Sequence, residues 1–335
     1  MIASVVYPRA AVIWNPSDGY NGKTIAFVFD DYRAEAQILP SDKLVLENPA
    51  LNTLSYKNVM DLEQAIQAHG YNDERTSPHR LVHAAIKYFS GYAVEHFGLS
   101  LPATFHLQYQ STIPRSVGLA GSSAIIMATI KALLSLLKTQ MDKEVLAQLV
   151  LEIETKELEI SGGLQDRVAQ AFEIPITMDF DKEVMARSGH GRYYPISAIA
   201  ELNWYIAYPK DYSESSDRVH NDLRSRYDGG DVEVHKAMEQ FASLTGQFED
   251  ALGLKDIPAL NYLINKNYDL RQSIMEIDPK FQDLITVARD TGVSAKFTGS
   301  GGAIIGLYDN EAQFENLVQV MTLHQVHTFK PSIKL

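Results

Sequence analysis

The sequence contains no cysteine, and this absence removes several chemistries at once. Disulfide bonds, thiolate metal sites and cysteine nucleophiles are excluded, and the composition fits the reducing cytoplasm, where we expect the protein to reside. Positive charge is also scarce, since 30 Lys and Arg residues stand against 42 Asp and Glu residues, for a formal net charge of −12. This balance disfavours nucleic-acid binding, which needs an extended basic surface. A nucleotide ligand stays possible, because a phosphate site is built locally.

Long hydrophobic runs are missing as well. The apolar stretch after Ala124 is interrupted by Thr129 and Lys131, so it predicts a core helix rather than a membrane span. Residues 1–9 resemble the start of a strand and lack the pattern of an export signal, so we expect neither export nor membrane attachment. With 335 residues, of which 45% are apolar and 21% charged, the chain should fold as a soluble protein of one large or two medium domains.

Strand and helix patterns alternate irregularly along the chain, which predicts a mixed α+β fold. Strand-like segments cover residues 2–13, 24–38, 102–110, 174–180, 203–208 and 303–307. Helix-like segments cover residues 61–68, 77–97, 122–138, 142–158, 233–251, 257–275 and 279–291. Residues 211–231 are polar and show no apolar period, so we predict a mobile loop or hinge there.

A glycine-containing segment, Pro114–Ala124, lies where a strand pattern gives way to a helix pattern. Glycine permits positive φ and close approach of the backbone to a ligand. The first turn of a helix offers unpaired amides and the positive end of its dipole to an anion. Ser122 and Ser123 add hydroxyls that can bind a phosphate or a metal, although Ser122 could instead be a simple N-cap. No Gly-Lys-Ser/Thr run is present, so this is not a Walker-type loop.

Acidic residues gather just after this helix. Glu154 and Glu157 lie three positions apart near a predicted helix end, and Asp166 follows the turn at 162–163. Phosphoryl transfer needs one carboxylate near the acceptor hydroxyl and another near the metal. The cluster could meet both needs, or it could be a solvated helix face followed by a turn aspartate.

Two further turns complete the set of candidate sites. Asn15–Asp18 lies between two strand patterns, where an ordinary connection would have the same composition. Thr298–Gly302 precedes a strand and lacks the Gly-x-Gly-x-x-Gly spacing of a dinucleotide fold. Alone, each of these turns is weak evidence for a ligand-binding site.

Taken in order, these segments resemble the motifs of the GHMP kinases, the family of galactokinase, homoserine kinase, mevalonate kinase and phosphomevalonate kinase. Pro114–Ala124 resembles the central motif Pro-x-x-x-Gly-Leu-Gly-Ser-Ser-Ala, with Ala120 as one extra residue. That longer form, the run Gly-Leu-Gln-Asp-Arg-Val-Ala-Gln at 163–170 and Asn-Pro-Ser-Asp at 15–18 are similar to plant-type glucuronokinases. The first motif departs from the wider family, because Trp14 replaces a glycine and Asn15-Pro16 replaces Glu-His.

The resemblance implies ATP and Mg²⁺ as ligands and assigns a role to each matching position. Asp166 would be the catalytic base or would orient the acceptor hydroxyl, and Arg9 would stabilise its ionised form. Ser123 and Glu154 would bind the metal, with Glu157 a competitor for Glu154. The implied nucleotide-binding residues are Pro114, Gly118, Leu119, Ala120, Gly121, Ser122, Ser123 and Ala124. The implied substrate-binding residues are Asn15, Ser17, Asp18, Arg167, Gly299, Ser300 and Gly301.

Residues 217–227 also resemble glucuronokinases, and arginine binds a carboxylate with a planar two-point fork. The candidate arginines are Arg115, Arg167, Arg218, Arg224 and Arg226. We therefore expect ATP-dependent phosphorylation of the anomeric hydroxyl of D-glucuronate, giving glucuronate 1-phosphate and ADP. The alternatives are a GHMP kinase for a neutral sugar, an amino acid or an isoprenoid acid, and a sugar-sensing relative without catalysis.

The fold implied by the resemblance has two α+β domains: residues 1–190, like the second domain of ribosomal protein S5, and residues 191–335, ferredoxin-like. The oligomeric state is not indicated. His79 and His83 are four positions apart on a predicted helix and could share a metal, but a surface or semi-buried pair is the simpler interpretation. His190 is interpreted as a loop residue.

Overall fold

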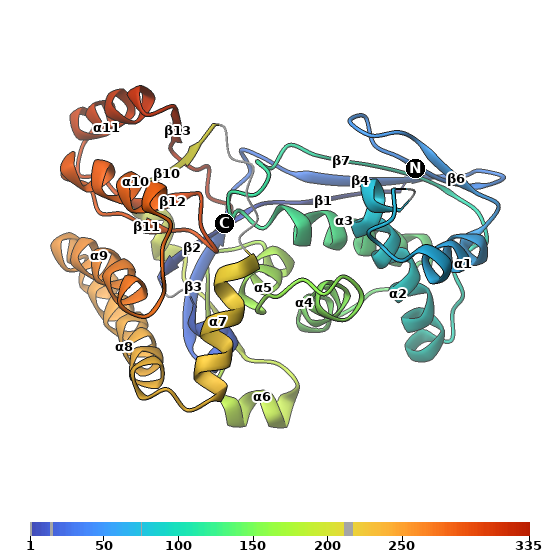
Figure 1. Cartoon of the computed structure of the whole chain (residues 1–335), viewed down its shortest axis with the longest axis horizontal. Helices are drawn as coiled ribbons and strands as arrows, with labels where there is room; N and C mark the ends of the chain where they lie inside the picture. The colour runs from blue at the N-terminus through green and yellow to red at the C-terminus, as the bar shows by residue number, and fades with distance from the viewer. Residues whose placement is uncertain (1, 14–15, 75, 211–216) are drawn as a thin grey trace. The chain divides into compact units, whose positions relative to one another are not determined.

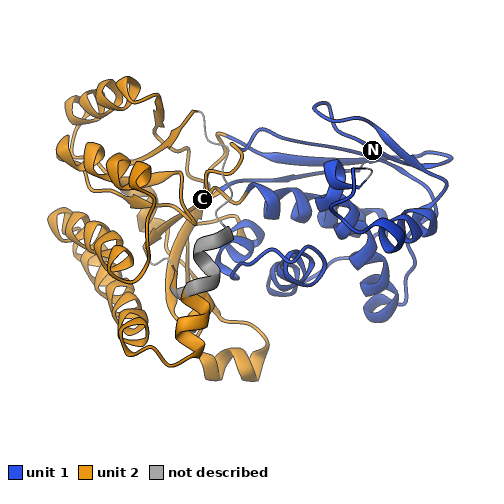
Figure 2. Ribbon diagram, in the orientation of Figure 1, with its two compact units in different colours: residues 1–8, 32–113, 121–171 blue, residues 9–31, 114–120, 172–335 orange. Residues whose placement is uncertain are grey.

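The chain forms two compact units, each built from segments that are far apart in the sequence (Figure 2). The computed structural model describes residues 2–13, 16–74, 76–210 and 217–335, with only the backbone for Ser17 and 217–222. Unit 1 consists of residues 1–8, 32–113 and 121–171, and unit 2 of residues 9–31, 114–120 and 172–335. The division into domains 1–190 and 191–335 stays a prediction.

Unit 1 is a five-stranded sheet covered by helices (Figure 1). The strands, in the order β1-β4-β7-β5-β6, are β1 (Ile2–Val6), β4 (Ala34–Leu39), β7 (His106–Ser111), β5 (Leu44–Glu47) and β6 (Leu54–Tyr56). The pairing is antiparallel except between β5 and β7, which run parallel. Parallel neighbours need a long crossover, and here it contains β6 and two helices.

The helices of unit 1 place the predicted phosphate loop and acid cluster. They are α1 (Val59–His69), a 3-10 turn (Ser77–His79), α2 (Arg80–Phe97), α3 (Gly121–Leu136), α4 (Lys143–Glu152), a π-helical turn (Ile153–Glu157) and α5 (Gln165–Phe172). Helix α3 packs against β1 and β4 and is covered in turn by α2. Because α3 lies between two layers, most of its side chains are buried, which explains its long apolar run.

Unit 2 contains two four-stranded antiparallel sheets. The first has the order β2-β3-β8-β9, with β2 (Arg9–Ile13), β3 (Lys23–Val28), β8 (Ile176–Asp179) and β9 (Arg192–Pro195). The second has the order β11-β12-β10-β13, with β11 (Lys296–Phe297), β12 (Ile304–Leu307), β10 (Trp204–Pro209) and β13 (Val326–Phe329). The Ala11 amide donates to Thr298 O at 3.0 Å, which joins β2 to the loop after β11.

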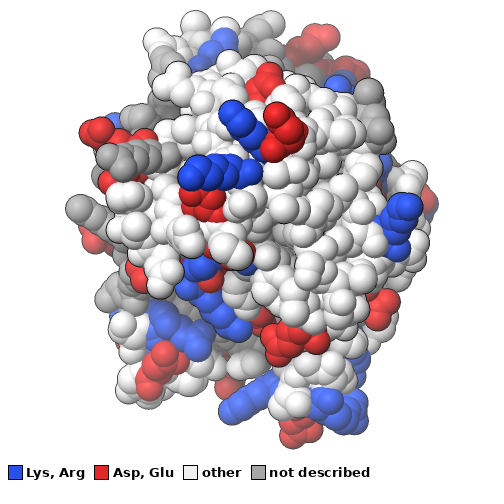
Figure 3. All heavy atoms as spheres, turned by 90° about the vertical axis from the view of Figure 1, so that its right-hand side faces the viewer, with Lys and Arg blue, Asp and Glu red and all other residues white. Residues whose placement is uncertain are grey.

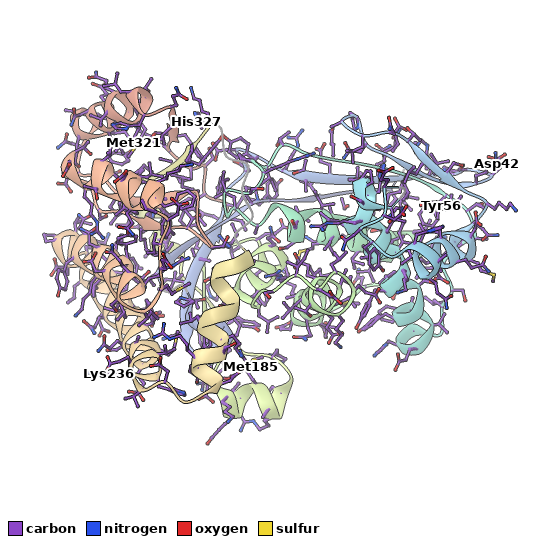
Figure 4. The ribbon with its side chains drawn as sticks, viewed as in Figure 1. Asp42, Tyr56, Met185, Lys236, Met321 and His327 are labelled. Carbon is purple, nitrogen blue, oxygen red and sulfur yellow. The ribbon has the colours of Figure 1, made fainter. Side chains whose placement is uncertain are left out.

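The helices of unit 2 are mostly capped by aspartates and asparagine. They are a 3-10 turn (Ser17–Tyr20), α6 (Lys182–Ser188), a 3-10 helix (Ser197–Glu201), α7 (Asp217–Asp228), α8 (Val232–Leu254), α9 (Ile257–Ile274), α10 (Pro279–Asp290) and α11 (Glu311–Leu323). Each cap accepts a hydrogen bond from an amide of the first turn, a contact worth about 1 kcal/mol. Met321 of α11 and His327 of β13 lie near each other in Figure 4, where α11 packs on β13.

The mixed α+β prediction is confirmed, and one local prediction is wrong. The chain from Asp217 to Asp228 is helix α7 rather than a mobile loop, while residues 211–216 lie outside the described residues. Of the side chains of α7 that the structure describes, 223–228, Leu223 is buried, and Arg224 pairs with Asp228 one turn later.

One face of the molecule shows how charged side chains are distributed over it (Figure 3). On the face in Figure 3, basic side chains lie beside acidic ones in small groups, separated by wide uncharged areas. Over the described part of the chain, none of the helices has both the length and the hydropathy to cross a membrane.

Candidate active site

Glu154 is the centre of a buried charged cluster in unit 1. It lies on the π-helical turn after α4, and only 1% of the residue is exposed. Its Oε2 accepts from Arg167 Nε at 2.6 Å and also from Arg167 Nη2, and its Oε1 lies 3.4 Å from Ser123 Oγ. Two of the predicted site residues, Ser123 and Glu154, are thus neighbours although they are 31 positions apart.

Electrostatics explain why this cluster needs Arg167. Burial raises the pKa of the Glu154 carboxyl, and the charge and hydrogen bonds of Arg167 oppose that rise. Arg167 is itself 4% exposed, and its Nη1 donates to Gly163 O at 2.7 Å. The guanidinium predicted to bind substrate is therefore already bound to Glu154 and to the turn before α5.

Asp166 is the accessible carboxylate of the cluster. It lies in the first turn of α5, with about a fifth of its side chain exposed. Arg167 Nη1 lies 3.8 Å from its Oδ2, and Gln165 Nε2 donates to its Oδ1 at 3.5 Å. The turn of α5 places Asp166 toward solvent and Arg167 toward Glu154. A carboxylate that is oriented but still reachable suits proton transfer with a ligand hydroxyl.

Glu157, the alternative to Glu154 as a metal ligand, has partners in and before α2. Its Oε2 accepts from Tyr71 OH at 2.6 Å and from Lys87 Nζ at 2.7 Å. The structure therefore places Glu154 beside Ser123 and binds Glu157 to α2 and its preceding loop. The extra residue of a π-helical turn changes which side chains face inward, and π-turns often occur at functional sites.

Helix α3 begins with the predicted serines. Ser122 is exposed at its amino end, whereas Ser123 and Ala124 are buried. The first-turn amides have no partner within a helix and attract an anion. Ser122 thus offers its hydroxyl to a ligand, and Ser123 offers its hydroxyl to the side of the helix that carries Glu154.

The loop that leads into α3 belongs to unit 2 and has an unusual backbone. Ser116, Gly118 and Ala120 all have positive φ, of 60°, 77° and 60°. Ala120, the extra residue relative to the common motif, therefore occupies a conformation that most residues avoid. Leu119 is buried, and its carbonyl accepts from the Arg9 amide at 3.3 Å. Pro114 lies at the start of this loop.

Gly118 contacts the last glycine loop directly. A Cβ on Gly118 would lie 2.6 Å from Gly301 O, and a Cβ on Gly299 would lie 2.4 Å from Gly118 O. Both clashes are with backbone, so only glycine fits at these two positions. The phosphate loop and the loop 298–302 of unit 2 thus pack backbone to backbone.

Arg9 joins the same two loops. It is 3% exposed, and its Nη1 donates to Gly118 O at 2.9 Å and to Thr298 O at 2.7 Å. The predicted catalytic cation is therefore held against both glycine loops of unit 2.

The predicted substrate turn is described only in part. Asn15 and the side chain of Ser17 lie outside the described residues. Asp18 accepts from the Gly19 amide at 2.8 Å, and Arg224 Nη1 of α7 donates to Gly19 O at 2.9 Å. Helix α7, which was predicted as a loop, is thus attached to this turn.

The candidate arginines differ in what they contact. Arg224 and Arg226 form ion pairs with Asp228 and Asp231, at 3.0 and 2.9 Å. Arg115 is exposed within the phosphate loop, and the side chain of Arg218 lies outside the described residues.

His79 of the 3-10 turn and His83 of α2 form a buried cluster rather than a surface or semi-buried pair. His79 Nε2 lies 2.7 Å from Asn52 O and its Nδ1 lies 2.8 Å from Tyr109 OH. His83 Nδ1 lies 3.1 Å from Thr76 O, and its Nε2 lies 3.0 Å from Tyr56 OH. All four ring nitrogens have protein partners, so a shared metal is not supported. Figure 4 labels Tyr56, the tyrosine partner of His83.

Sequence reasoning assigned no role to two basic residues near the last glycine loop. Arg271 of α9 donates to Gly299 O and Ser300 O, at 2.8 and 2.7 Å, and Lys296 Nζ donates to Ala11 O at 3.0 Å. Lys296 begins the segment 296–302 that resembles the third motif of the family, whereas Arg271 lies in an ordinary helix pattern that indicated no role.

The donors beside α3 fit magnesium. Ser123, Glu154 and Asp166 offer hydroxyl and carboxylate oxygens, the ligands that Mg²⁺ prefers. In the part of the chain that the structure describes, no group of three or more His, Cys, Asp or Glu residues forms a ready-made metal cage. Mg²⁺ commonly takes one or two carboxylates and completes its shell with phosphates and water.

Comparison with known proteins agrees with this geometry. Residues 80–173 match the GHMP kinases N terminal domain, and residues 248–325 match the GHMP kinases C terminal domain. Glucuronokinase 1 of Arabidopsis thaliana is 34% identical over 89% of this chain and 83% of its own length. Probable glucuronokinase 2 of the same plant is 35% identical over 89% of this chain and 82% of its own.

The fold is shared with solved kinases at much lower identity. Lactococcus lactis galactokinase, solved in complex with galactose, superposes with a TM-score of 0.79 at 16% identity, over 99% of this chain and 94% of that one. The chain belongs to the GHMP kinase family. It is therefore an ATP-dependent kinase, and the resemblance seen in its motifs is confirmed.

Proposed function

We propose that this kinase phosphorylates the anomeric hydroxyl of D-glucuronate with ATP, giving glucuronate 1-phosphate and ADP. The observation that carries the proposal is the identity of 34% and 35% with two glucuronokinases over 89% of the chain. It is supported by the motifs at 15–18, 114–124 and 163–170, which take the glucuronokinase form rather than the general one.

In the proposed reaction the acceptor oxygen attacks the γ-phosphorus of ATP, and the bond from that phosphorus to the bridging oxygen of ADP breaks. Asp166 accepts the hydroxyl proton or orients the hydroxyl for attack. Its partial exposure and its contacts with Gln165 and Arg167 support either role. Catalysis of this kind depends mainly on position and charge.

The phosphates would be bound by the amino end of α3 and by the loop 114–124 before it. Mg²⁺, when bound, neutralises phosphate charge, and Ser123 and Glu154 are the residues that would bind it. Arg167 stabilises the ionised form of Glu154, which is the form that a metal requires. Arg9 is proposed as a catalytic cation.

The sugar would be bound by the turn at 15–18, through Asn15, Ser17 and Asp18, and by the loop at 299–301. Arg167 already contacts Glu154, and Arg224 and Arg226 already contact aspartates. Exposed Arg115 is therefore the described candidate best placed to bind a new carboxylate.

The test is ADP release with Mg²⁺, ATP and a panel of acceptors: glucuronate, galacturonate, glucose, galactose and mevalonate. We expect the highest kcat/KM for glucuronate, and phosphorus NMR should show a phosphate at the anomeric oxygen. Better turnover of galactose or mevalonate would overturn the acceptor assignment while leaving the kinase assignment intact.

A further inference from the structure

The two carboxylates of the π-helical turn have different neighbours. Residues three positions apart on an α-helix lie on the same face. Glu154 and Glu157 are three positions apart, yet Glu154 Oε1 lies 3.4 Å from Ser123 Oγ of α3. Glu157 instead accepts hydrogen bonds from Tyr71 and Lys87. An α-helical register would turn both carboxylates toward one face, so the π-helical register is what allows both sets of contacts.

The backbone of the turn has an uncommon conformation. The Leu158 amide donates to Ile153 O at 3.2 Å, and the Ile160 amide donates to Glu154 O at 2.8 Å, so these bonds span five and six positions. Glu159 lies between the two amides and has a φ of 55°, which is uncommon for a residue with a side chain. Backbone of this kind persists where the surrounding contacts stabilise it. The contacts of the turn with its neighbours therefore decide whether it keeps this register.

Glu157 accepts two such contacts on one oxygen. Its Oε2 accepts from Tyr71 OH at 2.6 Å and from Lys87 Nζ at 2.7 Å, and its side chain is 18% exposed. Lys87 Nζ also lies 5.7 Å from the centre of the Tyr71 ring, so the three side chains contact one another. Burial and the hydrogen bond to Glu157 raise the pKa of Tyr71, so its hydroxyl stays a donor at neutral pH. The carboxylate is thus fixed by two charge-assisted hydrogen bonds.

Helix α2 also contacts the residue just before the turn. Tyr88 OH donates to Glu152 Oε2 at 2.6 Å, and Glu152 is the last residue of α4. Tyr88 follows Lys87 in α2. Successive residues of one helix therefore hold the turn at its beginning, through Glu152, and at its end, through Glu157, and Glu154 lies between these two points.

We propose that Glu157, bound by Tyr71 and Lys87, is a positioning residue, which holds the π-helical turn in the register that directs Glu154 to Ser123. The proposal rests on the function proposed above, in which Ser123 and Glu154 bind Mg²⁺. A turn that is fixed before the metal binds lowers the entropic cost of binding.

This role differs from that of Arg167. Arg167 contacts the Glu154 carboxylate itself, whereas Glu157 acts on the backbone that carries Glu154. Losing the contacts of Glu157 leaves both charges of the Glu154–Arg167 pair in place but allows the turn to take another register. The affinity for metal should therefore fall, while the affinity for nucleotide without metal should not.

The experiment changes the two partners of Glu157 and leaves Glu157 in place, with the variants Lys87→Met, Lys87→Arg and Tyr71→Phe. If Glu157 were itself the metal ligand, removing Lys87 would release its carboxylate and strengthen metal binding. If Glu157 positions the turn, the same change should weaken metal binding. The direction of the effect therefore separates the two roles.

Lys330→Met is the matched control. Lys330 Nζ donates to Glu311 Oε2 at 2.6 Å and lies 5.4 Å from the centre of the Tyr308 ring, so it combines an ion pair and a tyrosine contact as Lys87 does. Lys330 belongs to unit 2, whereas the turn belongs to unit 1. Its loss should leave the affinity for metal within about twofold of wild type.

Binding of Mn²⁺ in the presence of a non-hydrolysable ATP analogue, followed by electron paramagnetic resonance, is the first measurement. Lys87→Met should weaken Mn²⁺ binding about 10-fold, the loss typical of outer contacts that orient a metal ligand. Tyr71→Phe should weaken it about 3-fold, as expected for one hydrogen bond. Lys87→Arg, which keeps the charge and its donors, should recover most of the affinity.

Turnover is the second measurement. In Lys87→Met the apparent KM for Mg²⁺ should rise, while kcat at saturating Mg²⁺ should stay close to wild type. A general loss of folded protein would lower kcat instead, so the two effects can be told apart. If the wild-type protein does not phosphorylate glucuronate, the proposed acceptor fails, but the Mn²⁺ titration still decides on the role of Glu157.

Hydrogen exchange at the Leu158 and Ile160 amides tests the turn without metal or substrate. Both amides should exchange faster in Lys87→Met and Tyr71→Phe than in wild type and in Lys330→Met. Tyr71→Phe removes a single oxygen atom and covers the case in which Lys87→Met does not fold. Unchanged exchange, wild-type Mn²⁺ affinity in the folded variants, or stronger Mn²⁺ binding by Lys87→Met would overturn the proposal.

Discussion

At the scale of single residues, the candidate site combines a buried carboxylate, Glu154, with a partly exposed carboxylate, Asp166. Glu154 accepts hydrogen bonds from Arg167, whereas Asp166, the residue before Arg167 in α5, is about a fifth exposed. A buried, paired carboxylate is fixed in place, and an accessible one can exchange protons. This difference supports the proposed roles, in which Glu154 binds the metal and Asp166 acts on the acceptor hydroxyl.

Asp166→Asn tests the second task. The amide retains the size and one acceptor oxygen but cannot accept a proton, so kcat should fall by about 10²- to 10⁴-fold. Binding of an ATP analogue, measured by titration calorimetry, should stay close to wild type. Asp179→Asn is the matched control, because Asp179 has a similar exposure of 21% and an arginine partner, Arg192. An Asp166→Asn protein with full turnover would show that this residue does not carry the chemistry.

At the scale of elements, His79 of the 3-10 turn and His83 of α2 connect these two helices to the sheet of unit 1. His79 bonds to Tyr109 of β7, and His83 bonds to Tyr56 of β6. Each ring also faces a backbone carbonyl, which must accept a hydrogen bond. The nitrogen that faces the carbonyl must therefore donate, and in the neutral ring the other nitrogen accepts from the tyrosine hydroxyl. Burial lowers the pKa of both imidazoles and so favours the neutral form.

The free energy of unfolding of the protein should consequently decrease when the pH becomes mildly acidic. Burial lowers the pKa of His83 from 6.5 to about 4, so between these values the unfolded chain binds the proton more readily than the folded one. The free energy of unfolding should then fall as pH falls, with His83 accounting for about 2 kcal/mol between pH 7.5 and 5. Urea unfolding at both pH values measures this.

His83→Gln should reduce this pH dependence, whereas His96→Gln should not. His96 lies on the same helix, but it is exposed. Equal pH dependence in wild type and His83→Gln would show that other groups cause the effect.

The sequence allowed prediction of elements whose pattern is local. The loop 114–120 and helix α3 were predicted because glycine, serine and an apolar run carry the signal within a few residues. Helix α7 was missed because its stabilising contacts, such as Arg224 with Gly19 O, come from a distant segment. Glu154, rather than Glu157, faces Ser123 in a π-helical turn, and the sequence pattern did not predict that turn. Arg271 was missed because its carbonyl partners are 28 and 29 positions away.

At the scale of the whole molecule, neither unit is a continuous piece of chain. The sheet β2-β3-β8-β9 takes three of its strands from before residue 190 and one, β9, from after it. The loop 298–302 likewise contacts Arg9 and Gly118. Unit 2 therefore needs the early part of the sequence to complete its own core.

A fragment of residues 191–335 should accordingly fail to fold alone. It would contain β9 without its partner β8, and it would expose the apolar residues that β2 and β3 cover in the whole chain. Circular dichroism and proton–nitrogen NMR should show lost helix signal and poor peak dispersion. The full-length chain under the same conditions is the control, and a well-dispersed spectrum of the fragment would contradict the expectation.

The contact between Gly118 and the loop 298–302 also bears on the order of events during synthesis. The two segments are about 180 positions apart, as for Thr298 and Gly118, so the ribosome completes the first long before the second exists. Helix α3 and its sheet can form early, because their partners are already made. The contact between Gly118 and the loop 298–302 cannot, so the proposed phosphate site lacks this contact until residue 302 has been synthesised.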